Sequence, residues 1–290
     1  MEIPTTLFLL ISLVLLLPQL ILSTVYEPDF FFSKCSDKFG NYSNNSPFKK
    51  NLHNALASIS SRSSTRTQVS DYGFYKASSG EEPDRANVKA LCRGGVSLEL
   101  CRICVRNSVR RILQTCPSQK EGAGWYGDCQ IVYSNNSIDG EISVAGATQT
   151  LFSTNRAPDA RGFNEALREL LDGLREKAAS GSCIRKSASG DVKLQAPNTT
   201  YTIYGLADCF PDMSSLDCDV CLSRLQSKIP NCCSGSTGAR LIATSCQINY
   251  EIHPLYYSFL SASDRAIFTS NTICHPDLGS FHHLLLLNFQ

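Results

Sequence analysis

Two segments of the chain place apolar residues at helical spacing. The members of the first stripe are Phe48, Leu52, Ala55, Leu56 and Ile59, and those of the second are Phe163, Leu167, Leu170, Leu171 and Leu174. The two sets share the same offsets, and each puts one apolar stripe on one face of a helix. Ser46 and Pro47 precede the first stripe as an N-cap and a first helical residue. The pattern predicts an amphipathic helix in each half of the chain.

Each half also predicts a second helix and several strands. The second helices run from about Ser97 to Leu113 and from about Ser214 to Ile229, where Pro230 ends the helix. Strand-like sequence rich in Ile, Val and Tyr surrounds Cys129 and Cys246, and further strands are predicted at Tyr72–Tyr75 and Tyr201–Tyr204. This order predicts an α+β fold in which two helices cover one face of an antiparallel sheet, used twice.

The cysteines show that the two halves are copies of one unit. Their spacing is C-x8-C-x2-C-x11-C-x12-C in both halves, without an insertion. The positions are Cys92, Cys101, Cys104, Cys116 and Cys129, then Cys209, Cys218, Cys221, Cys233 and Cys246. A repeat of this length is typical of tandem domains rather than of a solenoid. We expect the domains at residues 26–137 and 142–257.

The N-terminal segment indicates a secreted protein. Residues 1–23 contain an apolar run from Leu7 to Ile21, broken at Pro18, and end on the small residue Ser23. This is typical of a secretory signal peptide, and the run is short for a spanning helix. We therefore expect a mature chain without a stable membrane span, in an oxidising extracellular compartment. The sequence predicts no structure for the tail at residues 258–290.

Charge disfavours a nucleic-acid partner. Lys and Arg number 27 against 26 Asp and Glu, so the formal net charge is +1, and neither half forms a basic arm. Arg102, Arg106 and Arg110 nevertheless form a stripe along one predicted helix. The stripe is either a solvated helix face or a contact surface for an acidic partner. The neighbouring aromatic residues Trp125 and Tyr126 are expected in the core or between the domains.

The cysteine pairs suit either zinc or disulfides. C-x2-C on a helix places two sulfur atoms on one face, one turn apart. Zinc requires four ligands, yet no His recurs at matching positions, since His53 and His253 do not correspond. Together with the signal segment, this favours disulfides, and we expect neither a metal nor a cofactor.

The flanking sequence carries a specific resemblance. The twofold C-x8-C-x2-C spacing is accompanied by GNYS at 40–43, LCRG at 91–94, IPNCC at 229–233 and YEIHPLY at 250–256. With these motifs the chain resembles the plant cysteine-rich repeat secretory proteins, whose domain is the ginkbilobin-like, or stress-antifungal, domain. The same tandem pair forms the ectodomain of cysteine-rich receptor-like kinases. The resemblance implies a five-stranded antiparallel sheet with two helices in each domain.

The resemblance also implies a disulfide pattern. The pairs carried over are Cys35–Cys116, Cys92–Cys101, Cys104–Cys129, Cys209–Cys218 and Cys221–Cys246. The second copy has no counterpart of Cys35. The pairing of Cys183, Cys232, Cys233 and Cys274 therefore stays open among three arrangements.

A mannose-binding site is the third implication of the resemblance. The family site combines an Asn, an Arg and a Glu that together bracket sugar hydroxyls. In the second copy Arg240 and Glu251 match, and Asn155 is the nearest candidate for the Asn. The corresponding positions of the first copy read Ser36, Ala123 and Ser134, so we expect no such site there. The alternative is that Arg240 and Glu251 form a cross-strand ion pair.

These observations lead to an expected function. Sequons at Asn41, Asn44, Asn135 and Asn198 are expected to carry glycans. The sequence shows no catalytic motif, so a non-enzymatic secreted protein of the apoplast, of the stress or defence type, is expected. Its ligand is expected to be a mannose-type glycan bound by the second domain. The alternative is a protein-interaction module whose partner is a receptor-like kinase ectodomain or a second copy of the chain.

Overall fold

The computed structural model describes residues 27–62, 73–140, 148–180, 185–196 and 199–255. The predicted signal segment 1–23 and the tail 258–290 lie outside these residues, as do Cys183, Asn198 and Cys274. Within the described ranges, every helix is too short or too polar to traverse a lipid bilayer.

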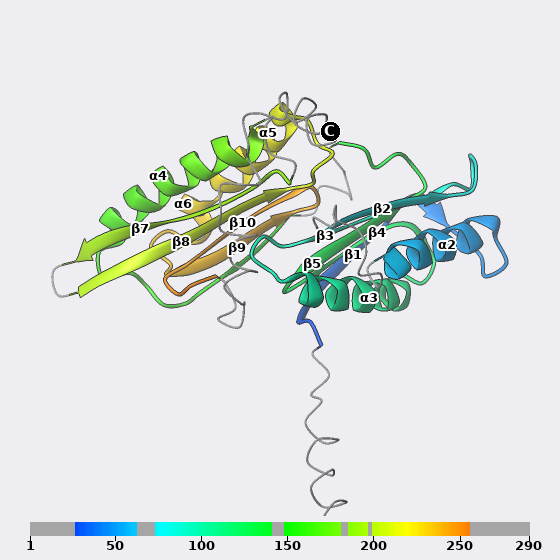
Figure 1. The fold of residues 1–290 in the computed structure, drawn as a ribbon, viewed down its shortest axis with the longest axis horizontal. Coiled ribbons are helices and arrows are strands. Elements are labelled where there is room, and N and C mark those ends of the chain that lie inside the picture. The colour runs from blue at the N-terminus through cyan, green and yellow to red at the C-terminus, as the bar shows by residue number, and fades with distance from the viewer. Residues whose placement is uncertain (1–26, 63–72, 141–147, 181–184, 197–198, 256–290) are drawn as a thin grey trace, which may run out of the picture.

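The first unit is a five-stranded antiparallel sheet with two helices (Figure 1). Its elements are β1 (Phe30–Asn41), α2 (Pro47–Arg62), β2 (Phe74–Ser79), β3 (Ala86–Cys92), α3 (Leu98–Thr115), β4 (Gln119–Tyr126) and β5 (Cys129–Ser134). The strands pair in the order β1-β4-β5-β3-β2, so β1 and β2 are the edges.

The second unit repeats this arrangement. Its elements are β6 (Thr148–Phe152), α4 (Ala160–Ala179), β7 (Ser187–Ala196), β8 (Thr199–Cys209), α5 (Ser215–Gln226), α6 (Ile229–Cys232), β9 (Gly238–Ala243) and β10 (Cys246–Glu251). The strand order is β6-β9-β10-β8-β7, which matches the first unit position for position. The predicted α+β class with two five-stranded antiparallel sheets is confirmed.

Serine side chains start the helices at equivalent places in the two units. Ser97 Oγ accepts a hydrogen bond from the Leu100 amide at 3.3 Å, and Ser214 Oγ accepts one from the Asp217 amide at 3.0 Å. Each bond satisfies an amide that has no partner within its own helix. The C-x2-C pair then follows one turn into each helix, and this fixes where its sulfur atoms lie.

The predicted end of the last helix is wrong. The sequence predicts one helix from Ser214 to Ile229 that ends at Pro230. Instead α5 ends at Gln226, and Pro230 lies in the first turn of the separate helix α6. Proline is tolerated there because the amides of a first helical turn have no intrahelical acceptor.

The structure contains six disulfides among the described residues. Five of them join Cys35–Cys116, Cys92–Cys101, Cys104–Cys129, Cys209–Cys218 and Cys221–Cys246, the same pairs that the family resemblance implies. The sixth joins the neighbours Cys232 and Cys233, which the sequence leaves open. In each unit two bridges fasten the C-x2-C helix to the central strands, so helix and sheet are covalently linked.

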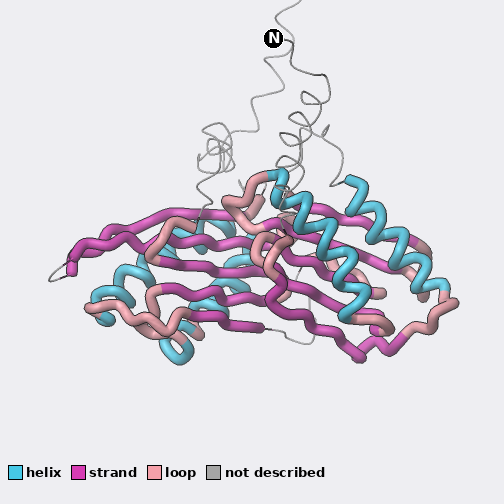
Figure 2. Tube along the Cα trace, turned by 90° about the horizontal axis from the view of Figure 1, so that it is seen from below, coloured by secondary structure: helices cyan, strands magenta, loops and turns pink. Residues whose placement is uncertain are grey.

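The helices of the two units lie on opposite sides of the paired sheets (Figures 1 and 2). The face of the first sheet that points away from α2 and α3 is buried against the second unit. Leu91, Trp125 and Val132 on this face belong to the same hydrophobic cluster as the core of the second unit. Trp125 is 1% exposed and stacks on Phe32 at 4.5 Å, which confirms its expected place between the units.

Polar contacts hold the same interface. The Gly94 amide donates to Asp208 Oδ2 at 3.0 Å, and Arg185 Nη2 donates to the Cys92 carbonyl at 2.6 Å. Lys89, fully buried on strand β3, places its Nζ 2.5 Å from Asp212 Oδ2. These contacts fix the position of one sheet relative to the other.

Candidate functional site

The strand register locates the predicted sugar-binding positions. In the second sheet Arg240 pairs with Asn249 and Glu251 pairs with Gly238, on the adjacent strands β9 and β10. Leu151 of the edge strand β6 lies opposite Arg240 on its other side. Arg240 therefore lies next to the edge strand β6, and Glu251 lies on the middle strand β10.

Both residues line a groove between the two units. The groove has a volume of about 560 Å³. The first unit contributes Asp29, Phe31, Arg93 and Gly127, and the second contributes Leu151, Phe152, Ser153, Ala239, Arg240, Asn249, Glu251, Pro254 and Leu255. A volume of this size suits a small ligand such as an oligosaccharide.

Arg240 is held by the protein itself. Its Nε and Nη2 donate to Gln247 Oε1 at 3.2 and 2.8 Å, and its Nη1 donates to the Gly127 carbonyl of the first unit at 3.0 Å. Its guanidinium also lies 5.0 Å from the ring centre of Phe31. The alternative, a cross-strand ion pair with Glu251, is not among the ion pairs of the described residues, where Arg240 directs its donors to Gln247 and Gly127. Arg240 joins the two units and forms a fixed wall of the groove.

Glu251 has a different environment. It is half-buried, and the described residues include neither a hydrogen bond nor an ion pair to its carboxylate. Burial raises the pKa of the Glu251 carboxyl above its ordinary value, and the charge of His253 opposes the shift. Gly238 lies directly opposite, where a Cβ would overlap the carboxylate. The missing side chain at Gly238 thus gives the carboxylate the space that it occupies.

Asn155 does not join this site. Its side chain is exposed and it is not among the residues that line the groove. In the first sheet Cys35 lies opposite Gly122, and in the second Phe152 lies opposite Ala239, the equivalent position. The residue equivalent to Ser36 is therefore Ser153, which does line the groove.

Exposed apolar side chains border the same groove. Phe31 is 37% exposed, Leu151 is 40% exposed and Phe152 is 48% exposed. Among the large apolar residues that the structure describes as exposed, only Leu216 lies elsewhere, on α5. Three such residues around one groove form an apolar rim next to the polar groups of Asp29 and Asn249. The sequence could not identify this rim, because it combines the edge strands β1 and β6 of different units.

The equivalent positions of the first unit are closed. Ser36 is 4%, Ala123 0% and Ser134 1% exposed. Ala123 is covered by the second unit and belongs to the shared core. In the first unit these positions offer no surface to a ligand.

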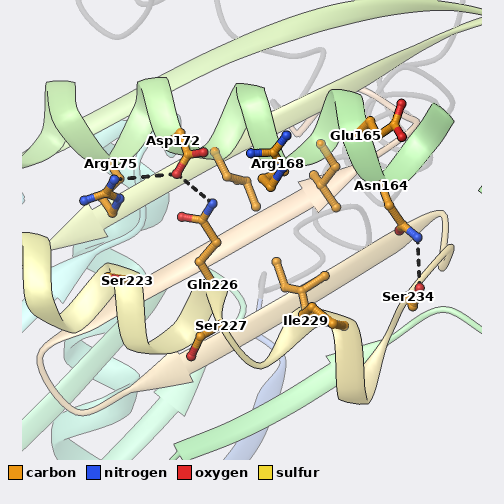
Figure 3. A pocket seen from close by; sticks show the side chains of 13 residues that line it. Asn164, Glu165, Arg168, Asp172, Arg175, Ser223, Gln226, Ser227, Ile229 and Ser234 are labelled. Carbon is orange, nitrogen blue, oxygen red and sulfur yellow. Dashed lines mark hydrogen bonds and ion pairs between the residues drawn. The ribbon is translucent and has the colours of Figure 1, made fainter. Parts of the chain in front are cut away.

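A second cavity lies between the helices α4 and α5, with a volume of about 510 Å³ (Figure 3). Leu167, Leu171 and Ile229 contribute its apolar surface. Several of the labelled polar residues bind each other: Gln226 Nε2 donates to Asp172 Oδ1 at 3.0 Å, and Asn164 Nδ2 donates to Ser234 Oγ at 2.9 Å. These polar groups already have partners in the protein, so the cavity offers a ligand less than the groove between the units does.

Three of the predicted glycosylation sites lie within the described residues. Asn41 and Asn44 are exposed on the first unit, and Asn135 is half-buried at the end of β5. Among the residues that the structure describes, no group of three or more His, Cys, Asp or Glu side chains is arranged to hold a metal ion.

Comparison with known proteins shows the family. The model of the salt stress response/antifungal family matches residues 34–136 and again 149–253. Cysteine-rich repeat secretory protein 38 of Arabidopsis thaliana is 32% identical over 85% of this chain and 93% of its own length. The antimicrobial ginkbilobin-2-like protein of Castanea crenata is 34% identical over 84% of this chain and 96% of its own.

Receptor-like relatives match over part of their length. Cysteine-rich receptor-like protein kinase 25 of Arabidopsis thaliana is 36% identical over 90% of this chain, which spans 38% of the kinase. The crystal structure of the tandem DUF26 ectodomain of PDLP8 from the same plant has a TM-score of 0.60 at 22% identity. It covers 77% of this chain and 98% of its own, and it shows the shared fold. Since the family model matches most of the sequence in two copies, this chain belongs to the salt stress response/antifungal family.

Proposed function

We propose that this protein is a non-enzymatic protein of the plant apoplast, of the stress or defence type, that binds a mannose-type glycan. The site is the groove between the two units, and Glu251 is its central ligand-binding residue. The observation that carries the proposal is a half-buried carboxylate without a described partner, beside an apolar rim. The family membership and the relatives named as secretory and antimicrobial support an extracellular role.

The chemistry of the groove suits a sugar. A sugar presents hydroxyl groups along its edges and C–H groups on its faces. The carboxylates of Glu251 and Asp29 accept hydrogen bonds from hydroxyls, and the Asn249 amide both donates and accepts. The rings of Phe31 and Phe152 offer apolar surface for a sugar face. Arg240 is a positioning residue here, because its contacts with Gln247 and Gly127 keep the walls of the groove in place.

Calorimetric titration with an α-linked mannose oligosaccharide tests this proposal. The wild-type protein is expected to bind. Glu251→Gln removes the charged acceptor, and Phe152→Ala removes half-exposed apolar surface. Glu251→Gln is expected to weaken binding by about tenfold, since a hydrogen bond to a charged group contributes about 1.5–3 kcal/mol. Phe152→Ala is expected to weaken binding by a similar factor, since burying a Phe side chain contributes about 1.5–3 kcal/mol. Leu216→Ala is the matched control, because Leu216 is also exposed and apolar but lies outside the groove. Absence of binding by the wild type, or unchanged binding by Glu251→Gln, contradicts the proposal.

A second candidate function is protein interaction through the same groove. It is favoured by Phe31 and Phe152, which lie on β1 and β6, the edge strands of the two sheets. An edge strand can pair with an extended segment of a partner, and apolar side chains beside it add affinity. The partner would be a receptor-like kinase ectodomain or a second copy of this chain. Capture of such an ectodomain that Phe152→Ala abolishes, together with no response to mannose oligosaccharides, would favour this function.

A further inference from the structure

The helices of the first unit carry an unbalanced positive charge. α2 and α3 contain the basic residues Lys49, Lys50, Arg62, Arg102, Arg106, Arg110 and Arg111, and a single acidic residue, Glu99. The equivalent helices α4 and α5 contain Arg161, Arg168, Arg175, Lys177 and Arg224 against Glu165, Glu169, Asp172, Glu176, Asp217 and Asp219. The charge therefore belongs to one unit of the repeat, while the chain as a whole is close to neutral.

This charge is exposed. Arg106, Arg110 and Arg111 are exposed on α3, and Lys50 is exposed on the adjoining helix α2. The described ion pairs involve none of these four residues. Arg110 donates to the Asn107 side chain at 2.7 Å, and Arg111 lies over the Phe30 ring at 4.8 Å, so the contacts of both arginines among the described residues are with uncharged groups. We call Lys50, Arg106, Arg110 and Arg111 the basic face.

The spacing of the basic face suits a linear polyanion. Arg106 and Arg110 are four residues apart, which places them about 6 Å apart along the helix axis, and Arg111 follows directly. Each guanidinium can bind a carboxylate with two parallel hydrogen bonds. One exposed ion pair contributes little, so measurable binding requires several pairs that form together. A polymer with a carboxylate on each repeating unit provides them.

Two other polyanions fit this surface less well. Binding to an anionic membrane usually combines basic residues with apolar side chains that enter the lipid. Binding to single-stranded nucleic acid usually requires exposed aromatic rings for base stacking. The exposed large apolar residues of the described chain are Phe31, Leu151, Phe152 and Leu216, and none of them lies on α2 or α3. The basic face therefore offers charged groups without an exposed large apolar side chain beside them on α2 or α3, which suits a hydrated polysaccharide.

We propose that the basic face of the first unit binds an acidic polysaccharide, a linear chain of sugar units that carry carboxylate groups. This binding uses the helix side of the first unit and does not involve the groove between the units. It would hold the protein on a matrix of acidic polysaccharide and leave the groove open.

Affinity for immobilised polygalacturonate, measured by biolayer interferometry, tests this proposal. The wild-type protein is expected to bind at low ionic strength and to lose affinity as salt screens the charges. The variant Lys50→Gln/Arg106→Gln/Arg110→Gln is expected to lose about tenfold or more, because three exposed ion pairs are removed. Monomeric galacturonate is expected to compete poorly with the polymer.

The control variant removes the same number of positive charges, but from the second unit. Arg161→Gln/Arg168→Gln/Lys193→Gln removes three exposed cations from the second unit, and it is expected to keep the wild-type affinity within about twofold. Equal loss in both variants would overturn the proposal, because net charge rather than the basic face would then explain binding. Binding to phosphatidylserine vesicles but not to polygalacturonate would also overturn it, as would equal competition by the monomer. Thermal unfolding of both variants checks that they are folded.

Discussion

Replacing Asp212 by Asn tests how the two units are held together. Asp212 lies in the second unit, after β8, and faces two lysines of the first unit. The Lys89 Nζ lies 2.5 Å from its Oδ2, and the Lys76 Nζ lies 3.4 Å from the same oxygen. Lys76 and Lys89 are direct partners across β2 and β3. The substitution keeps the shape of the side chain but leaves Lys89 as a buried charge without its counter-ion.

The expected loss of stability follows from burial. The Lys89 side chain is 0% exposed and the Asp212 side chain is 20% exposed. Removing one partner of a buried pair usually costs about 3–5 kcal/mol. The partial exposure of Asp212 places the expected loss near the lower end, at about 3 kcal/mol. For a chain of this size that corresponds to a fall in Tm of roughly 6–12 °C, measured by calorimetry or circular dichroism.

Asp139→Asn is the matched control. Asp139 forms an ion pair with the same Lys76, but its side chain is 64% exposed and that of Lys76 is 39% exposed. Exposed pairs contribute about 0–1 kcal/mol, so this variant should unfold close to the wild-type temperature. Adding Lys89→Met to Asp212→Asn should restore much of the lost stability, because the buried charge is then gone. The reasoning is refuted if Asp212→Asn destabilises the protein no more than Asp139→Asn, or if Lys89→Met gives no recovery.

Three further predictions follow from the groove and the core. Because burial raises the pKa of Glu251, protonation on acidification begins at a higher pH than for an ordinary Glu. The loss of the carboxylate acceptor should lower mannose-oligosaccharide affinity by about tenfold in calorimetry at decreasing pH, and Glu251→Gln should be insensitive to pH over that range. Trp125→Ala should lower the free energy of unfolding by about 3–5 kcal/mol in denaturant titrations, because Trp125 fills the core shared by the two units. Ser97→Ala should cost about 1 kcal/mol in the same assay, because the N-cap bond to Leu100 is lost.

Features set by neighbouring residues could be predicted from the sequence. The stripes that begin at Phe48 and Phe163 predict helices because burial of one helix face depends on local periodicity. The cysteine spacing predicts two copies of one unit, because the C-x2-C helix must face the same strand in each. The end of α5 could not be predicted in this way, since proline is compatible with both the end and the first turn of a helix.

Features set by contacts between units could not be predicted. From the sequence, Arg240 could be either a sugar ligand or an ion-pair partner. Its actual partner, the Gly127 carbonyl, belongs to the other unit, so the sequence around Arg240 does not indicate it. The sequence offers Asn155 as the nearest candidate for the Asn, but Asn155 does not line the groove. The second unit, however, has two fewer residues between the edge strand and the first helix, and Phe152 takes the place of the Cys35 anchor. The correct register therefore emerges only from strand pairing, which assigns Ser153 to that position.

The most direct test of glycan binding in the groove is amide chemical-shift mapping by NMR during titration with the mannose oligosaccharide. The amides of Gly127, Ser153 and Asn249 are expected to shift together with increasing ligand, because they belong to residues that line the groove. The amide of Ala123, the buried residue of the first unit at the position equivalent to Arg240, should not shift. Shifts confined to residues along α4 and α5, or no shifts at saturating oligosaccharide, would contradict the account.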